Sequence, residues 1–376
     1  MKHYVLVNHH QIHLPGFRDL IKNLKRNENF VISHWGSKQF IDPKKSHFKS
    51  ISLIGNFQKL DKNCNPLREP DHDLLDFWAK LPVPRVWISS MVDLHLGINQ
   101  MLFGKNTFSK LDGKQIVSDL FNGLAWSYEH NKFNLENKGE MDEMWSKFWI
   151  SAATTHDFLI KKFENRLDFP WAVNPPSTNP NHREKQYVFC IPGAEYPTRV
   201  RVEEQLGKYY KLAPYRQSDR ILRSAVDLSS RIFPPIRPKR VAIKKKLREI
   251  NMNHHINSSN FTFVDGGPLN YFVRKYLEVV ISGSTLICPP SHILKMYGLI
   301  ENKHFLDANF FLQYPRDVST TFTKFDLLPS FDLTFLLENH TFDARTLQLF
   351  SFLELLSNGY VGLGIFINGE LVFQKK

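Results

Sequence analysis

The first half of the chain alternates short apolar runs with amphipathic segments. The apolar runs have the length and the polar borders that are typical of strands, and they cover residues 4–8, 30–33, 50–54, 84–89 and 149–153. Apolar residues recur at helical spacing over residues 17–26, 71–81, 112–128 and 155–163. This alternation predicts a mostly parallel sheet with helices on both faces.

A proline-rich segment then interrupts the pattern. Residues 169–181 contain four prolines and three asparagines, which cannot continue a helix and suit a connection between domains. The alternation restarts after it, with strands expected over 186–191, 261–264 and 285–288 and helices over 199–212, 269–282 and 345–356. Asn368 and Gly369 separate two apolar runs within residues 365–373, which predicts a β-hairpin.

The domain organisation follows from this restart. The sequence predicts an α/β protein with two β/α domains: an N-terminal domain over 1–172, a linker over 173–185 and a C-terminal domain over 186–376. The C-terminal helix and hairpin are assigned to the second domain. The length of 376 residues fits two domains of ordinary size.

The composition indicates a globular protein and the compartment in which it is expected to work. Hydrophobic residues make up 42% of the chain, which is enough to form real cores. No run of about 18 apolar residues free of charge is present, so no membrane-spanning helix is expected, and the N-terminus lacks a signal-peptide pattern. Cys64, Cys190 and Cys288 are too far apart for a metal site or a disulfide framework, which predicts a cytoplasmic protein.

The most informative stretch is residues 265–290. Glycines and Pro268 precede a predicted helix, and such a helix start offers free N–H groups and a positive dipole end to a phosphate or a sugar hydroxyl. Glu278 lies ten residues into that helix. Its carboxylate either accepts hydrogen bonds from a ribose diol or forms an ordinary surface pair with Arg274, four residues earlier.

A family resemblance rests on this stretch. Glu278-x-x-x-x-Gly283, followed by an apolar strand and proline, resembles the donor-site segment of two-domain GT-B glycosyltransferases, nearest to the group-1 and spore-maturation-type branches. The turn and Tyr-Pro-x-Arg pattern over 188–199 is similar to the first strand and turn of the family's donor domain. The segment 149–156, the linker entry at 172–175 and the segment 297–306 follow in the family's order. The resemblance covers residues 150–310.

The resemblance implies a fold and a function. The fold is GT-B, in which two Rossmann-like domains face a central cleft. The function is transfer of a sugar from a nucleoside-diphosphate sugar to a carbohydrate or lipid-linked acceptor, as in the synthesis of surface polysaccharides or glycoconjugates. It also implies a metal-independent reaction without a cofactor. The donor-site residues that it implies are Gly193, Arg199, Gly267, Asn270, Tyr271, Arg274, Lys275 and Glu278.

These residues have distinct implied roles. Glu278 would hold the ribose, Asn270 and Tyr271 would approach the sugar or phosphate, and the cationic side chains would neutralise the diphosphate. Asn270 stands where the broader family often has a second glutamate. That departure leaves open a non-catalytic carbohydrate-binding or scaffold protein of the same fold, and it leaves retention or inversion undecided.

The base of an inverting transfer would come from the first domain. The loops after strands 4–8 and 84–89 reach the carboxyl edge of the sheet, where ligands bind in such folds. The candidates in those loops are His10, His13, Asp93 and His95. No further residues at metal-ligand spacing follow these histidines, so no metal site is predicted.

The net charge of +12 includes one run without acidic residues, Arg231–Arg248. It fits a solvated helix face, diphosphate contact or peripheral contact with an anionic membrane, which would place the protein at the inner membrane face. Aromatic residues are too sparse in the run to favour single-stranded nucleic acid, and nucleic acid is not the expected partner. A transferase that decorates DNA remains the alternative that the charge allows.

Overall fold

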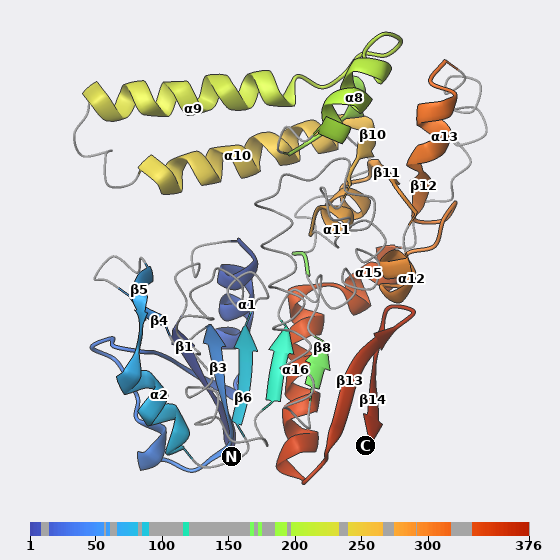
Figure 1. Cartoon of the computed structure of the whole chain (residues 1–376). Helices are drawn as coiled ribbons and strands as arrows, with labels where there is room; N and C mark the ends of the chain where they lie inside the picture. The colour runs from blue at the N-terminus through green and yellow to red at the C-terminus, as the bar shows by residue number, and fades with distance from the viewer. Residues whose placement is uncertain are drawn as a thin grey trace. The chain divides into compact units, whose positions relative to one another are not determined.

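The computed structural model describes residues 1–8, 15–55, 58–60, 66–81, 85–89, 116–119, 166–168, 172–174, 185–193, 197–232, 240–265, 274–290, 292–316 and 333–375 (Figure 1). The chain divides into two compact units. The first unit comprises Met1–Asn174 and Glu338–Lys376, and the second comprises Pro175–Leu337.

The first unit is built on an eight-stranded sheet of order β14-β13-β8-β7-β6-β3-β1-β2. All neighbouring strands pair in parallel except β13 and β14. The strands are β1 (Lys2–Asn8), β2 (Phe30–His34), β3 (Phe48–Gly55), β6 (Arg85–Ser89), β7 (Ile116–Asp119), β8 (Arg166–Asp168), β13 (Gly362–Ile367) and β14 (Glu370–Lys375). A separate ribbon pairs β4 (Gln58–Leu60) with β5 (Pro66–Pro70).

The helices of this unit are α1 (Pro15–Arg26), α2 (His72–Ala79), α16 (Phe342–Ser357) and a short 3₁₀ turn over Pro43–Lys45, while α15 (Leu333–Asn339) crosses the boundary of the units. Asp71 caps α2 by accepting a hydrogen bond from the Leu74 backbone N–H at 2.9 Å. Thr341 caps α16 in the same way through the Ala344 N–H, at 3.2 Å.

The core of the first unit combines the two ends of the chain. Aliphatic side chains of β1, β3 and α1 pack with Leu349, Phe352 and Leu353 of α16. The buried His3 ring lies 2.8 Å from both Ser50 Oγ and the Glu354 carboxylate, so β1, β3 and α16 are also joined by polar contacts. This packing makes α16 an integral part of the first unit.

The C-terminal segment therefore corrects the predicted domain division. The sequence prediction assigned all of 186–376 to the second domain, but β13 pairs in parallel with β8 of the first sheet. The hairpin itself is confirmed: Asn368 and Gly369 both adopt positive φ, 50° and 88°, as its tight turn requires. The local turn signal was sufficient to predict the hairpin. The pairing of β13 with β8, about 200 residues earlier in the chain, is a long-range contact that no local pattern predicts.

A second correction concerns the predicted helix over 112–128. Ile116–Asp119 forms β7, which pairs between β6 and β8. The apolar residues at helical spacing suggested a helix, whereas the β-branched Ile116 and Val117 fit a central strand. The predicted strand 149–153 and helix 155–163 lie outside the described residues.

The second unit has a four-stranded parallel sheet of order β12-β11-β10-β9. Its strands are β9 (Tyr187–Cys190), β10 (Ser259–Phe263), β11 (Thr285–Cys288) and β12 (Phe305–Asp307). Its helices are α8 (Pro197–Leu206), α9 (Tyr215–Ile232), α10 (Arg240–Asn257), α11 (Arg274–Ile281), α12 (His292–Met296) and α13 (Ala308–Gln313). The predicted α/β class, with a parallel sheet in each half, is confirmed.

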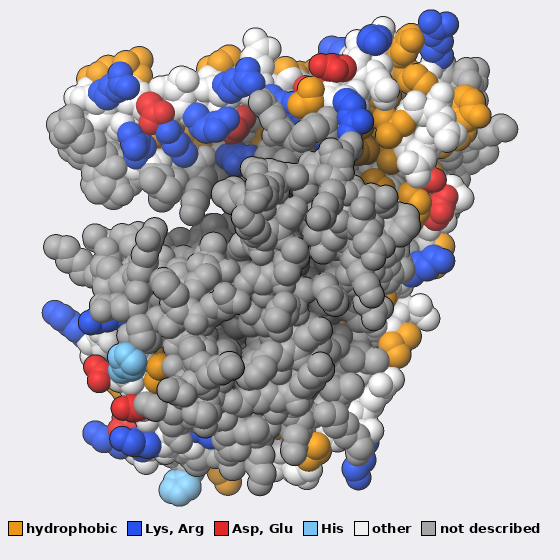
Figure 2. All heavy atoms as spheres, in the orientation of Figure 1, with side chains coloured by type: hydrophobic (Ala, Val, Ile, Leu, Met, Phe, Trp, Pro, Cys, Tyr) orange, Lys and Arg blue, Asp and Glu red, His pale blue; other side chains and the backbone are white. Residues whose placement is uncertain are grey.

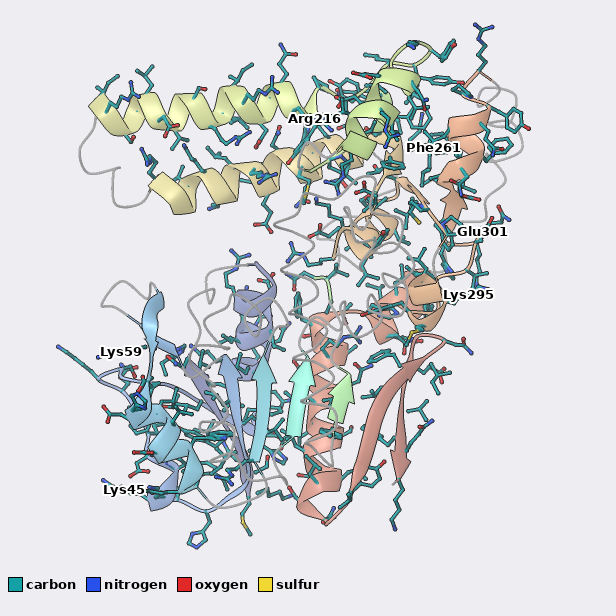
Figure 3. The ribbon with its side chains drawn as sticks, in the orientation of Figure 1. Lys45, Lys59, Arg216, Phe261, Lys295 and Glu301 are labelled. Carbon is teal, nitrogen blue, oxygen red and sulfur yellow. The ribbon has the colours of Figure 1, made fainter. Side chains whose placement is uncertain are left out.

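Aromatic side chains form much of the core of this unit. Phe189, Phe261, Phe263 and Phe311 pack with Val202 and Leu206 of α8. Phe261 is labelled on β10 in Figure 3. Arg216, also labelled there at the start of α9, pairs with Glu203 of α8 at 2.7 Å and so fixes the beginning of the long helix pair α9–α10.

Candidate functional site

The site is centred on the turn that follows β9. Gly193 lies three residues after the end of that strand with φ +122°, a conformation that L side chains rarely adopt. Asp265 lies two residues after the end of the neighbouring strand β10. Both residues are thus at the carboxyl edge of a parallel sheet, which is the edge where ligands bind in open α/β folds.

A buried ion pair links the two strand ends to α8. Arg199, in the first turn of α8, is 3% exposed, and Asp265 is 4% exposed. Arg199 Nε donates to Asp265 Oδ1 at 2.6 Å, Nη2 donates to the same oxygen, and Nη2 also lies 3.4 Å from the Asp265 carbonyl oxygen. A buried guanidinium needs such a partner, and the pairing fixes the direction in which it points.

Two cationic groups lie directly against the backbone of Gly193. A methyl group added to Gly193 would overlap Arg199 Nη1 and would stand 2.7 Å from Lys275 Nζ and 3.2 Å from Arg199 Cζ. Arg199 comes from α8 and Lys275 from the first turn of α11. Only glycine allows both side chains to approach the turn this closely.

The charges around Lys275 are unbalanced toward the positive. Burial, together with the charges of Arg199 and Arg248, lowers the pKa of its amine from 10.5 to about 8, against the opposite effect of Glu278 and Asp265. A bound anion would raise the proton affinity of this amine again. The electrostatics of the turn therefore favour an anionic ligand.

Glu278 is partly buried on α11 and its carboxylate is engaged locally. Arg274 Nη2 lies 2.5 Å from Glu278 Oε1, at the i,i+4 spacing, and 3.7 Å from Glu249 of α10. The surface-pair interpretation of Glu278 thus describes a contact that is present. The ribose role of Glu278 stays a prediction, because a carboxylate with two oxygens can keep one pair while accepting a further hydrogen bond.

The structure brings together five of the eight predicted donor-site residues in the second unit: Gly193 and Arg199 after β9, and Arg274, Lys275 and Glu278 on α11. The other three, Gly267, Asn270 and Tyr271, lie outside the described residues, as do the candidate bases His10, His13, Asp93 and His95. Their roles stay predictions.

Sequence reasoning gave Asp265 no role in this site and named Arg248 only as part of the basic run Arg231–Arg248. Asp265 orients Arg199, and Arg248 of α10 adds to the positive field at Lys275 while its Nε lies 3.3 Å from the Tyr215 hydroxyl. A carboxylate directly after an apolar strand and before two glycines was a usable signal for Asp265. Arg248 is the last residue of the basic run Arg231–Arg248, for which diphosphate contact was one alternative, but which member of the run reaches the site depends on how α10 packs.

Three further observations concern the remaining chemistry. Cys190 and Cys288 are buried at the ends of β9 and β11, and burial raises the pKa of both thiols, which makes them poor nucleophiles. Within the described ranges, no three His, Cys, Asp or Glu side chains gather closely enough to hold a metal ion. In the same ranges no helix is both long and apolar enough to span a membrane.

In comparisons with known proteins, no protein-family model and no curated protein sequence matches the chain. Among solved structures, the chain is similar to sucrose-phosphate synthase (tll1590) from Thermosynechococcus elongatus, with 10% sequence identity and a TM-score of 0.48, over 96% of this chain and 100% of that one. The residues of the site, and not this similarity, carry the functional argument.

Proposed function

We propose that the protein is a glycosyltransferase of the GT-B type that uses a nucleoside-diphosphate sugar, and that the diphosphate binds at the Gly193 turn. The observation that carries this proposal is the convergence of Arg199 and Lys275 on the bare backbone of Gly193. The resemblance of residues 265–290 to a nucleotide-sugar donor segment supports the same assignment.

A diphosphate matches this turn in charge and in shape. It carries several negative oxygens within a short distance, and two cationic side chains from different helices can contact it while the glycine backbone leaves room. In glycosyl transfer the negative charge of the leaving diphosphate grows as the sugar departs. Preorganised cations at that position would stabilise the transition state more than the ground state.

The finer roles belong to the same proposal. Glu278 would accept hydrogen bonds from the ribose, while Gly267, Asn270 and Tyr271 would approach the sugar or phosphate. The first unit would bind a carbohydrate or lipid-linked acceptor, with the general base drawn from His10, His13, Asp93 and His95. Surface polysaccharide or glycoconjugate synthesis is the process that such a reaction would serve.

The test is direct binding of nucleotides to the full-length chain. We expect a nucleoside diphosphate to raise the unfolding temperature and to bind in calorimetry more tightly than the corresponding monophosphate and nucleoside, because the second phosphate reaches both cations. UDP, GDP, ADP and TDP are compared as probes. Equal affinity for the diphosphate, monophosphate and nucleoside, or no binding of any of them, would contradict the proposal.

A further inference from the structure

Half of the excess positive charge of the chain lies on the helix pair α9–α10. These two helices carry nine Lys and Arg residues and three Asp and Glu residues, within a chain of net charge +12. All three acidic residues lie near cationic partners: Asp219 pairs with Arg223 at 3.0 Å, Asp227 with Lys244 at 2.6 Å, and Glu249 with Arg274 of α11 at 3.7 Å. The helix pair therefore presents a basic surface.

An aliphatic stripe runs along α9 beside these charges. Ile221, Leu228 and Ile232 are 61%, 59% and 60% exposed, and Ala225 is exposed between them. The spacing of four, three and four residues places all four side chains on one helical face. The opposite side of the same helix provides its buried residues, Tyr215, Asp219, Val226 and Ser230. The stripe is thus not the face by which α9 packs on its own unit.

Two exposed arginines border the stripe. On the helical wheel Arg220 and Arg231 lie together on one side of it, beyond Gln217 and Ser224, and both are exposed. Figure 2 shows hydrophobic side chains along the outer edge of the helix pair with Lys and Arg side chains directly beside them. An aliphatic stripe edged by arginines is the pattern of a helix that lies in the plane of a membrane surface.

We propose that α9 docks on an anionic lipid surface, with Ile221, Leu228 and Ile232 entering the boundary between headgroups and acyl chains and the flanking arginines contacting lipid phosphates. This surface shares Arg231 and Ile232 with the predicted run Arg231–Arg248 and otherwise lies outside it. The described part of the run after Ile232 lies on α10, where Arg240 and Lys244 pair with Asp227. The docking does not depend on the proposed glycosyl transfer.

Other occupants fit the same surface less well. Two copies of α9 packed through the stripe would bring Arg220 and Arg231 of both copies close together, and like charges oppose such pairing. A nucleic acid would match the arginines but leave the aliphatic side chains without a partner, and no aromatic side chain lies on the stripe for base stacking. A lipid surface satisfies both parts of the pattern.

The experiment is co-flotation of the full-length chain with vesicles. We expect binding to vesicles made of equal parts phosphatidylcholine and phosphatidylglycerol, and none to phosphatidylcholine alone at the same salt concentration. The triple variant Ile221→Ser, Leu228→Ser and Ile232→Ser is expected to weaken the binding by about a thousandfold, because each of the three aliphatic side chains contributes about tenfold. Arg231→Gln weakens it to a smaller extent.

The matched control is Ile300→Ser, an exposed isoleucine of the same unit outside the helix pair, which leaves vesicle binding unchanged. Thermal unfolding checks that every variant is folded. Absence of binding to the anionic vesicles would overturn the proposal, and so would binding that the triple variant retains in full. Concentration-dependent self-association that disappears in the triple variant, without vesicle binding of the unaltered chain, would also overturn it and identify the stripe as a contact between copies.

Discussion

At the scale of single residues, Lys275 has an unusual environment for a lysine, since its pKa is lowered from 10.5 to about 8. Its ammonium group lies against Gly193 and shares the turn with the guanidinium of Arg199. Removing it takes away one contact to an anion and also one source of repulsion in the free protein. Binding and stability should therefore change in opposite directions.

We expect Lys275→Met to weaken nucleoside-diphosphate binding by about tenfold to a hundredfold, since a charge-assisted hydrogen bond contributes roughly 1.5–3 kcal/mol. The free protein is expected to keep or gain stability, because the cost of burying a charge and the repulsion from Arg199 are both lost. Calorimetry gives the affinity and thermal unfolding gives the stability. Lys295→Met, an exposed lysine on α12 that is labelled in Figure 3, is the control and leaves both unchanged.

The same residue sets a pH dependence. The pKa of Lys275 in the folded state is about 8, below the usual 10.5. The charged amine therefore lowers the free energy of unfolding, and this effect is fully present below pH 8. The effect disappears as the pH rises from about 8 to about 10.5, because over that range the unfolded chain binds the proton more tightly. An anion favours the protonated amine, so nucleotide binding takes up a proton above pH 8.

Nucleoside-diphosphate affinity is therefore expected to fall as the pH rises from 8 to 10, by at most about tenfold per unit. Calorimetry in two buffers of different ionisation enthalpy measures the proton uptake directly. Lys275→Met should abolish both the slope and the uptake. A variant that retains the full pH slope would show that another group is responsible.

At the scale of elements, the Gly193 turn combines an unusual backbone conformation with a tight space. Its positive φ and its two cationic neighbours are separate constraints, and they can be tested separately. Gly36 also has a positive φ, +69°, but no atom lies within 4 Å of the position that a Cβ would occupy. It therefore serves as a control for the backbone constraint alone.

Gly193→Ala is expected to destabilise the chain by about 1–3 kcal/mol from strain and overlap, and to abolish diphosphate binding by displacing Arg199 and Lys275. Gly36→Ala should cost about 1 kcal/mol from conformation alone and leave binding intact. Chemical denaturation and calorimetry measure the two effects. If Gly193→Ala bound diphosphate with unchanged affinity, the turn would not be the anion site.

The elements also show which parts of the structure could be predicted from the sequence. Residues 285–288 were predicted as a strand and form β11, and the hairpin was predicted from Asn368 and Gly369, because period and turn chemistry are local properties. Two features could not be predicted from the sequence. Ile116–Asp119 is a strand because of its sheet partners, and the Arg199–Asp265 pair joins residues 66 positions apart. The individual residues of the site were predicted from the family resemblance, while their geometry depends on packing.

At the scale of the whole molecule, the chain leaves the first unit and returns to it. Val173 hydrogen-bonds to both His340 and Phe342, so the outgoing and returning segments are tied together at the boundary. The Arg345 guanidinium lies 2.8 Å from His340 Nδ1 and covers the Phe366 ring at 4.7 Å. The last 39 residues thus complete a core that the first 174 residues begin.

This connectivity predicts how fragments behave. The fragment Pro175–Leu337 contains the entire second unit with the Gly193 turn, so it should unfold cooperatively and bind a nucleoside diphosphate as the full chain does. Residues 186–376, the division that the sequence alone suggests, carry α16 and the hairpin without their sheet. That fragment exposes the apolar side chains of Phe342, Leu349 and Phe352 and should aggregate. Circular dichroism, light scattering and calorimetry on both fragments distinguish the two domain divisions. A 186–376 fragment that is monomeric and folds cooperatively would contradict the assignment of the C-terminal segment to the first unit.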